Sequence, residues 1–241
     1  MNKALEDVAR RTGADLVGVA DLSLLAGLET NPADLLGGYT RAVSLAVKVA
    51  DGVMATIKGG PTPVYAHHYR VLNAQLDVVG LRVARFLEAQ GASALPIPAS
   101  LIVDRDRLMS LISHKAVAVA AGLAWQGKSL LAVTPGFGPR VRLTTVLTNA
   151  PLQAAKPGRN RCGACTACTE ACPAQAIRNV NTQWHYQSRE EAVDLAKCAA
   201  WVGKWRTDPL IGADICGVCV SVCPWGRPRK KGRPQGVELT A

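Results

Sequence analysis

The first 161 residues contain no cysteine, and all eight cysteines of the chain lie between Cys162 and Cys223. A disulfide-rich secreted scaffold is short and carries cysteine throughout, so this distribution argues against four disulfides and favours metal binding. The composition changes near residue 155. We therefore predict an α+β domain over 1–155, a cysteine-rich domain over 156–228 and a basic flexible tail over 229–241.

The chain also lacks a long uncharged apolar run. The nearest candidate, Ala116 to Trp125, is about half of the roughly 18 residues that a membrane helix needs. The first predicted helix is charged and no apolar stretch follows it, which disfavours a secretory signal peptide. We expect a cytoplasmic protein without a membrane partner.

Aromatic residues are scarce, at 5% of the chain, and no predicted helix combines a basic face with interleaved aromatic side chains. This disfavours recognition of nucleic acid by stacking. The formal net charge is +10, and part of it lies in a C-terminal cluster of Arg227, Arg229, Lys230, Lys231 and Arg233. Such a cluster is either a solvated tail or a contact for an acidic redox partner or RNA.

Apolar periodicity predicts the elements of the first domain. Helices are expected over 2–11, 65–90 and 111–121, and strands over 16–20, 42–49, 95–97, 101–103, 130–134 and 141–147. The last two strands are separated by a turn rich in proline and glycine, which predicts a hairpin. Because strands and helices do not alternate strictly, we predict an α+β fold with a mixed sheet.

The segment from Cys162 to Pro173 has the spacing C-x2-C-x2-C-x3-C-P of bacterial ferredoxins. Three thiolates on one tight loop can reach three corners of one cubane, and the fourth, expected at the start of a helix, points to a second cubane. A second run from Cys216 to Pro224 has the last three members of the same pattern. Cys198 is the one cysteine left to complete it.

The crossed ligation of two-cluster ferredoxins predicts how the eight thiolates are shared. Cluster 1 takes Cys162, Cys165, Cys168 and Cys223, and cluster 2 takes Cys172, Cys198, Cys216 and Cys219. Two zinc sites are the alternative, since paired C-x2-C units also bind zinc. Zinc needs neither a crossed ligand nor a proline after the last cysteine, so we predict two [4Fe-4S] clusters.

Besides the displaced Cys198, three segments resemble the epoxyqueuosine reductase family, relatives of the corrinoid-dependent reductive dehalogenases. They are AGLAWQGKSL at 121–130, LTTVLTNAPL at 143–152 and DICGVCVSVCPW at 214–225. The resemblance implies a nitroreductase-like N-terminal domain that cradles a cobalamin. It also implies a ferredoxin-type module that reduces the cobalt, and hence an iron-sulfur oxidoreductase.

The sequence departs from that family in two ways. The family's catalytic acid lies 17 residues before the tryptophan of its AGLGW segment, and position 108 holds a leucine here. Asp104 and Asp106 are possible substitutes, and His114 is the preferred histidine. Full-length family members also continue into a helical-repeat domain that helps to hold tRNA, so we expect a short relative for which a tRNA substrate is doubtful.

Six residues are candidates for contacts to a corrinoid. They are Gly122, Trp125, Gly127, Lys128, Arg140 and Arg142. A glycine-rich bend lets the backbone approach a flat cofactor or its phosphate, and the alternative is a helix end followed by a turn. The two arginines alternate with apolar residues and so share one strand face, where they bind cofactor groups or face water.

Three functions are compatible with these features. The clusters pass single low-potential electrons to a corrinoid or another acceptor held by the N-terminal domain, with a redox protein as partner. Alternatively the protein is a ferredoxin-like carrier that docks a partner enzyme without a corrinoid, or a reductive activator of a corrinoid protein. The sequence does not identify the final substrate.

Overall fold

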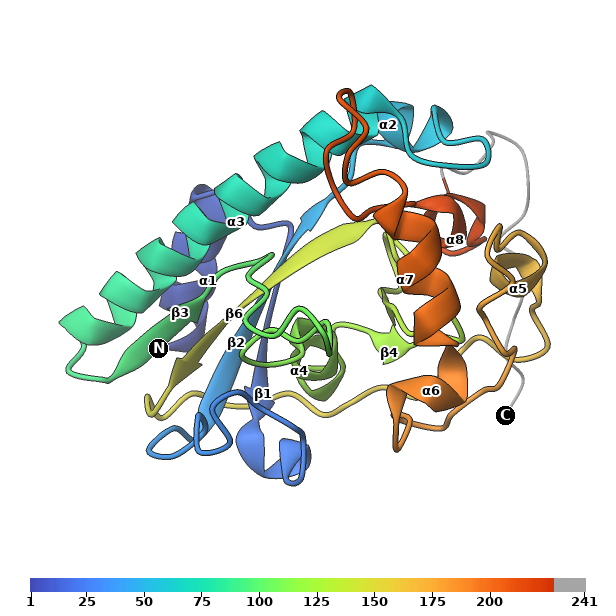
Figure 1. Ribbon diagram of the computed structural model, residues 1–241. Helices are drawn as coiled ribbons and strands as arrows, with labels where there is room; N and C mark the ends of the chain where they lie inside the picture. Colours follow the sequence, from blue (N-terminus) through green and yellow to red (C-terminus); the bar gives the residue numbers. More distant parts are fainter. Residues whose placement is uncertain (228–241) are drawn as a thin grey trace, which may run out of the picture.

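A computed structural model of the protein describes residues 1–227, and the predicted basic tail over 229–241 lies outside them. Figure 1 shows a sheet with helices on both faces and a group of short helices at one end. The helices are α1 (Asn2–Arg11), η1 (Leu22–Leu25), α2 (Asp51–Ala55), α3 (Pro63–Ala89), α4 (His114–Ala120), α5 (Ala167–Glu170), α6 (Arg189–Ala192), α7 (Leu195–Gly203) and α8 (Val218–Val222). The strands are β1 (Leu16–Asp21), β2 (Arg41–Lys48), β3 (Ala94–Ile97), β4 (Trp125–Gln126), β5 (Ala132–Val133) and β6 (Val141–Thr148).

The main sheet has the strand order β1-β2-β6-β3. Its centre is the pair β2 and β6, which align from Arg41 opposite Thr148 to Lys48 opposite Val141. Residues 42–47 of β2 are buried because helices cover both faces, which explains their nearly continuous apolar sequence. The α+β class is confirmed, but the predicted mixed sheet is wrong, since every described pair is antiparallel. The strands β2 and β3 run in the same direction, but β6 lies between them and so no parallel pair forms.

The helix α3 covers one face of the sheet together with α1, and α4 covers the other (Figure 1). The helix α3 begins after Thr62, whose side chain accepts a hydrogen bond from the Tyr65 amide. It ends before Gly91, which has a φ of +81°. Leu76, Val79 and other core-facing residues of α3 are fully buried. The long helix predicted from apolar periodicity is therefore confirmed.

The predicted hairpin between 130–134 and 141–147 is wrong. The strand β5 pairs with β4, whereas β6 pairs with β2 and β3. The turn closes on itself through reciprocal backbone hydrogen bonds between Thr134 and Gly138. β6 instead forms a full-length ladder with buried β2, which satisfies more backbone groups than a short hairpin would. The expected strand over 101–103 is also absent, because that stretch is irregular and leads into the isolated bridge between Asp104 and Met109.

The cysteine-rich segment packs directly on the N-terminal core. Ile211, Ile215 and Val218 belong to the same buried cluster as the apolar face of α3. Gly217, at the start of α8, has a φ of +83°, and a Cβ there would lie 2.6 Å from Ile57 and 2.9 Å from Tyr65. A glycine is needed at this position both for the left-handed backbone and for the close approach. Within residues 1–227, no helix is long and apolar enough to cross a membrane.

We predict that Leu76→Ala lowers the stability of the protein, because the Leu76 side chain is 0% exposed in the core between α3 and the sheet. Removing a buried leucine side chain typically costs about 2–5 kcal/mol. Val78→Ala is the matched control on the same helix, since Val78 is 54% exposed. The midpoint of thermal unfolding should fall clearly for Leu76→Ala and stay near wild type for Val78→Ala. Equal midpoints for the two variants would contradict the described packing.

Candidate functional site

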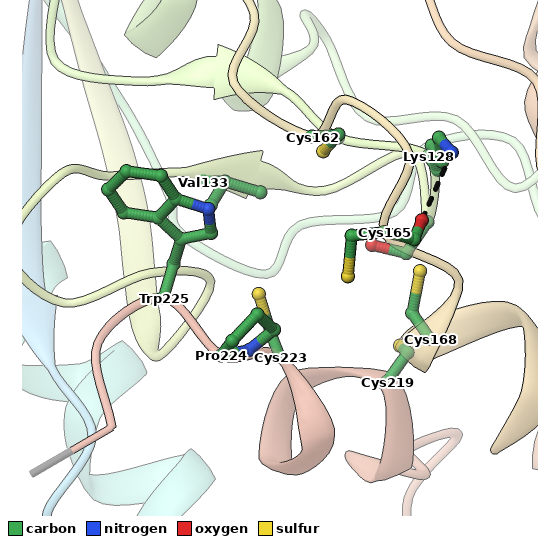
Figure 2. Close-up of a pocket in the computed structure, with 11 residues that line it drawn as sticks. Lys128, Val133, Cys162, Cys165, Cys168, Cys219, Cys223, Pro224 and Trp225 are labelled. Atoms are coloured by element: carbon green, nitrogen blue, oxygen red, sulfur yellow. Dashed lines mark hydrogen bonds between the residues drawn. The ribbon is translucent and has the colours of Figure 1, made fainter. Parts of the chain in front are cut away.

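Five cysteines from two separate segments line one cavity (Figure 2). Cys162, Cys165 and Cys168 come from the first motif, and Cys219 and Cys223 come from the second. The sulfur atoms of Cys162, Cys165, Cys168 and Cys223 face a common space in Figure 2. The other lining residues are Gly127, Lys128, Ser129, Val133, Pro224 and Trp225.

The fourth cysteine of each motif lies at the end of a short helix. The helix α5 ends at Glu170, before Cys172, and Cys223 is the C-cap of α8. The predicted position of such a cysteine at the start of a following helix is wrong. Because a proline follows each cysteine directly, the helical hydrogen bonding does not continue past it, and the chain turns away.

The cysteines that do not line the cavity are Cys172, Cys198 and Cys216, and together with Cys219 we call them the second cysteine group. Cys172 and Cys198 pack, together with Cys168 and Cys219, against a small apolar cluster that includes Ile177 and Tyr186. Burial raises the pKa of the Cys198 thiol, and negative charge on Cys172 and Cys216 raises it further. The same causes act on the pKa of Cys219, with Cys216 the strongest neighbour. Four thiols thus come within electrostatic reach of one another.

The thiols around the first cavity influence one another in the same way. Burial raises the pKa of Cys223 to about 11, and negative charge on Cys162, Cys168 and Cys165 adds to the rise. Burial also raises the pKa of Cys168, with Cys162 and Cys165 as further causes. Cys223 and Cys168 therefore hold their protons more tightly than a free thiol unless a cation compensates the thiolate charge.

Two tryptophans lie beside the first cysteine loop. The Nε1 atom of Trp125 donates a hydrogen bond to the Sγ atom of Cys162 at 3.4 Å. The Trp125 ring is 3% exposed and meets Trp225 edge-on, with 4.8 Å between ring centroids and 78° between planes. Arg161 lies 5.9 Å from the centroid of each ring. An indole N–H is thus held in place toward a cysteine sulfur.

Lys128 and Gly127 also support this loop, although the sequence suggested corrinoid contacts for both. The Nζ atom of Lys128 donates to the Cys165 carbonyl and to Oδ1 of Asn179, each at 3.0 Å, and its side chain is buried. A Cβ at Gly127 would lie 2.7 Å from Val133 and 3.6 Å from the Cys162 sulfur. These two residues therefore shape the cysteine cavity.

The other corrinoid candidates lie in different surroundings. Gly122 ends the turn after α4 with a φ of +71°, where a Cβ would lie 2.6 Å from the Lys156 carbonyl oxygen. Arg140 is buried and donates to the carbonyls of Ser221 and Gly226 at 2.9 and 2.6 Å. Its guanidinium thus joins the start of β6 to the chain that follows α8.

Arg142 faces α3. It donates to Oδ1 of Asn73 at 2.9 Å and to the Tyr69 hydroxyl at 3.2 Å, and its guanidinium lies 4.3 Å from the Tyr69 ring centroid. The structure thus separates Arg142 from the four candidates Trp125, Gly127, Lys128 and Arg140, which contact the cysteine-rich segment.

Two of the three candidate proton donors, His114 and Asp104, are engaged in local structure. His114 lies between the Thr145 hydroxyl at 2.8 Å and the Pro98 carbonyl at 3.1 Å. A carbonyl only accepts, so Nε2 donates to Pro98 and Nδ1 accepts from Thr145. Burial lowers the pKa of His114 to about 4, which makes the ring neutral at pH 7. Asp104 accepts from the Arg107 amide, and Asp106 is exposed.

Sequence reasoning missed Lys115, which follows His114 at the start of α4. Burial lowers the pKa of Lys115 to about 8, and the charges of Arg189 and Arg142 lower it further. Cys198 and Cys219 act in the opposite direction. Lys115 therefore lies within electrostatic reach of both the second cysteine group and Arg142. The lysine in the first turn of a helix was visible in the sequence, but its neighbours were not.

Asn160 and Asn179 were missed as well. Oδ1 of Asn160 accepts from the Cys162 amide at 2.8 Å, and its Nδ2 donates to the Gln126 carbonyl at 2.7 Å. Asn179 has a φ of +60°, which asparagine tolerates better than most residues. Asparagines that flank a cysteine motif were the available signal for this supporting role.

The comparisons with known proteins define the class of protein first. Residues 161–226 match the family model described as "4Fe-4S double cluster binding domain". The cysteine-rich part is therefore an iron-sulfur domain of the two-cluster kind. This class agrees with the two groups of thiols that the structure brings together.

The particular relatives are epoxyqueuosine reductases, so the resemblance indicated by the sequence motifs is confirmed. The protein of that name from Bacillus cereus is 33% identical over 147 residues, which cover 57% of this chain and 35% of the relative. The chain spans between about a third and a half of the length of the first curated relatives it matches. It is thus an epoxyqueuosine reductase-like iron-sulfur protein in the parts that align.

Solved structures show the same fold. The catabolic reductive dehalogenase NpRdhA, in complex with 3-bromo-4-hydroxybenzoic acid, matches with a TM-score of 0.73 at 20% identity, over 94% of this chain and 32% of that one. An epoxyqueuosine reductase with a tRNA-Tyr epoxyqueuosine-modified stem loop matches with a TM-score of 0.61 at 21% identity, over 94% and 65%. At these identities the likeness concerns the fold.

We predict that Trp125→Phe makes the cluster beside Cys162 harder to reduce. A hydrogen bond to a ligating sulfur withdraws electron density and raises the reduction potential, so its loss lowers the potential. A redox titration followed by electron paramagnetic resonance should show one of two clusters shifted to a lower potential. Trp205→Phe is the control, because the Trp205 indole nitrogen is buried and has no hydrogen-bond partner among residues 1–227. An unchanged pair of potentials in Trp125→Phe would refute a tuning role for the indole.

Proposed function

We propose that the eight cysteines hold two [4Fe-4S] clusters by crossed ligation. Cluster 1 takes Cys162, Cys165, Cys168 and Cys223, and cluster 2 takes Cys172, Cys198, Cys216 and Cys219. Clusters of this kind accept and release single electrons when bound. The observation that carries the proposal is that Cys223, from the second motif, shares a cavity with three cysteines of the first.

The electrostatic neighbours of Cys223 and Cys198 support the same partition. The thiols that act on Cys223 are Cys162, Cys168 and Cys165, whereas those that act on Cys198 are Cys172 and Cys216. Cys219 is influenced most by Cys216, next by Cys168, and then by Cys198 and Cys172. The two groups are therefore adjacent, and Cys168 and Cys219 lie where they meet. Adjacent groups favour electron exchange between the clusters.

The shape of the site favours clusters over zinc. Within residues 1–227, no three side chains of the His, Cys, Asp and Glu types are placed to hold a single metal ion. The cysteines instead surround a space, as ligands at the corners of a cubane do. Bound clusters would also offset the negative charge that burial makes costly for these thiolates.

We further propose that the protein is a cytoplasmic oxidoreductase that passes electrons to an acceptor held by its N-terminal part, with a corrinoid as the leading candidate. One support is a similar solved structure described in terms of "B12-dependent dehalogenation". The other is the sequence resemblance to the epoxyqueuosine reductase family, which also implies a nitroreductase-like fold for the N-terminal part. Lys115 and Arg142 are the residues of the N-terminal part that we assign to the acceptor side. Lys115 lies near the second cysteine group, and Arg142 contacts α3. Both side chains contribute positive charge.

One observation favours a different function, that of an electron carrier without a corrinoid. Leu108 occupies the position of the family's catalytic acid, and its side chain is 41% exposed. Arg189 donates to the carbonyls of Arg107 and Leu108 and so binds this loop to α6 through its backbone. No carboxylic acid stands at position 108 to donate a proton, which suits a protein that only transfers electrons. A reductive activator of a corrinoid protein would fit the same observation.

We predict that Cys198→Ala loses one cluster. The iron content of a double variant, Cys172→Ala with Cys198→Ala, distinguishes crossed from uncrossed ligation. In the crossed arrangement Cys172 and Cys198 bind the same cluster, so Cys172→Ala with Cys198→Ala should keep about four of about eight irons. In an uncrossed arrangement the double variant would damage both clusters and approach zero. Iron and sulfide analysis after anaerobic purification is the measurement. Lys197→Ala, at an exposed neighbour on α7, should retain all the iron.

We predict that the anaerobically purified protein with both clusters binds cobalamin at one equivalent, with a shift of the corrinoid absorption bands. Arg142→Gln should weaken this binding while leaving the iron content unchanged, because Arg142 contacts Tyr69 and Asn73 and none of the cysteines. An absence of any shift in a protein with about eight irons would reject the corrinoid and leave the electron carrier as the better proposal.

A further inference from the structure

One face of the cysteine-rich segment combines an exposed cysteine with a basic approach. Cys165 is exposed, whereas the other seven cysteines are partly buried. Lys156, Arg159 and Arg161 precede it in sequence, and all three are exposed. Among the ion pairs of residues 1–227 none involves these three side chains. We call Lys156, Arg159, Arg161 and Cys165 the basic face.

The basic face borders an open hollow of about 570 Å³. Its walls are residues 157–160 on one side and 181–184 on the other, and they combine polar side chains with apolar surface. The hollow is fixed to the first cysteine loop through Asn160, whose side chain accepts from the Cys162 amide. A protein seated in this hollow would therefore contact the same backbone that carries Cys162.

Arg161 places a positive charge close to the first cysteine cavity. Its guanidinium lies near Trp125 and Trp225, which both stand beside that cavity, and its side chain still reaches solvent. The one acidic residue of the segment 156–173 is Glu170 on α5, whose carboxylate accepts from the Thr166 hydroxyl. Three cations against one carboxylate give this segment a positive formal charge, counted without a bound cluster.

We propose that the basic face docks a small acidic protein that carries one electron. The inference rests on the proposed function, because a carrier is useful here only if the first cysteine group holds a cluster. Complementary charge speeds the encounter and orients the partner. Cys165 lines the first cysteine cavity and is exposed to solvent. One electron leaves the reduced carrier and one is gained by the iron-sulfur site, and no covalent bond changes.

A protein partner fits this face better than RNA does. Single-stranded RNA is held by exposed aromatic rings on which bases stack. The aromatic ring at the hollow is Trp184, which is partly buried and packs edge-on against His185 at 4.4 Å. The face thus provides positive charge beside a hollow of mixed polarity, without a stacking platform.

The test uses the full chain, purified anaerobically, and an oxidised plant-type [2Fe-2S] ferredoxin of negative net charge as the probe. Binding is measured by calorimetry at low and at moderate ionic strength. Replacing Lys156, Arg159 and Arg161 with glutamine should weaken the affinity about tenfold at low salt and flatten its salt dependence. The matched control replaces Arg11, Arg82 and Arg85, exposed residues of α1 and α3, and removes the same charge. It should bind like wild type.

Several results would overturn the docking proposal. Equal weakening in both triple variants would mean that only net charge matters, and no binding by wild type at low salt would mean that the face is not a docking site. Loss of RNA stem-loop binding in the first variant, with ferredoxin binding intact, would assign the face to RNA. Iron content and the electron paramagnetic resonance signals after dithionite reduction show whether the clusters are present, independently of the binding measurement. Failure of the proposed function is therefore distinguishable from failure of docking.

Discussion

Burial raises the pKa of Cys168 and Cys223 in the first group and of Cys198 and Cys219 in the second, and neighbouring thiolates raise it further. Four negative sulfur atoms that share a poorly solvated space repel one another. The deprotonated state in which these cysteines bind metal is therefore high in free energy without a compensating cation. An iron-sulfur cluster supplies that compensation. Much of the surrounding structure lowers the same cost, and the hydrogen bond from Trp125 to the Cys162 sulfur does so directly.

The loops that carry the cysteines are held by contacts from the N-terminal part of the chain. Lys128 binds the Cys165 carbonyl, and Arg140 binds the chain on both sides of Cys223. Gly217 lets α8 approach Tyr65 on α3, so that the second motif adjoins the main core. The two parts therefore do not have independent cores. A change in the sheet or α3 would move the cysteines, which suits a protein that must control distances for electron transfer.

Local patterns predicted those parts of the fold that depend on local rules. The α3 helix follows from apolar spacing with Thr62 at one end and Gly91 at the other, and the cysteine motif follows from spacing that three corners of a cubane require. The hairpin prediction failed because proximity in sequence favours β5 with β6, whereas the long buried ladder with β2 is a non-local pairing. The positions of Cys172 and Cys223 after short helices were also missed, because the proline after each cysteine was taken to start a helix when it follows the end of one.

The sequence by itself determined the class of site, because eight cysteines at ferredoxin spacing limit the chemistry, and it determined the relatives through three short motifs. Only the tertiary structure decided where the supporting residues lie. Trp125, Gly127 and Lys128 suggested a corrinoid surface in sequence, yet they surround the first cysteine cavity. Lys115 gave no signal of its own, yet α4 brings it near Cys198. Spacing along the chain determines which ligands one loop can present, but contacts between distant segments depend on packing that no local pattern encodes.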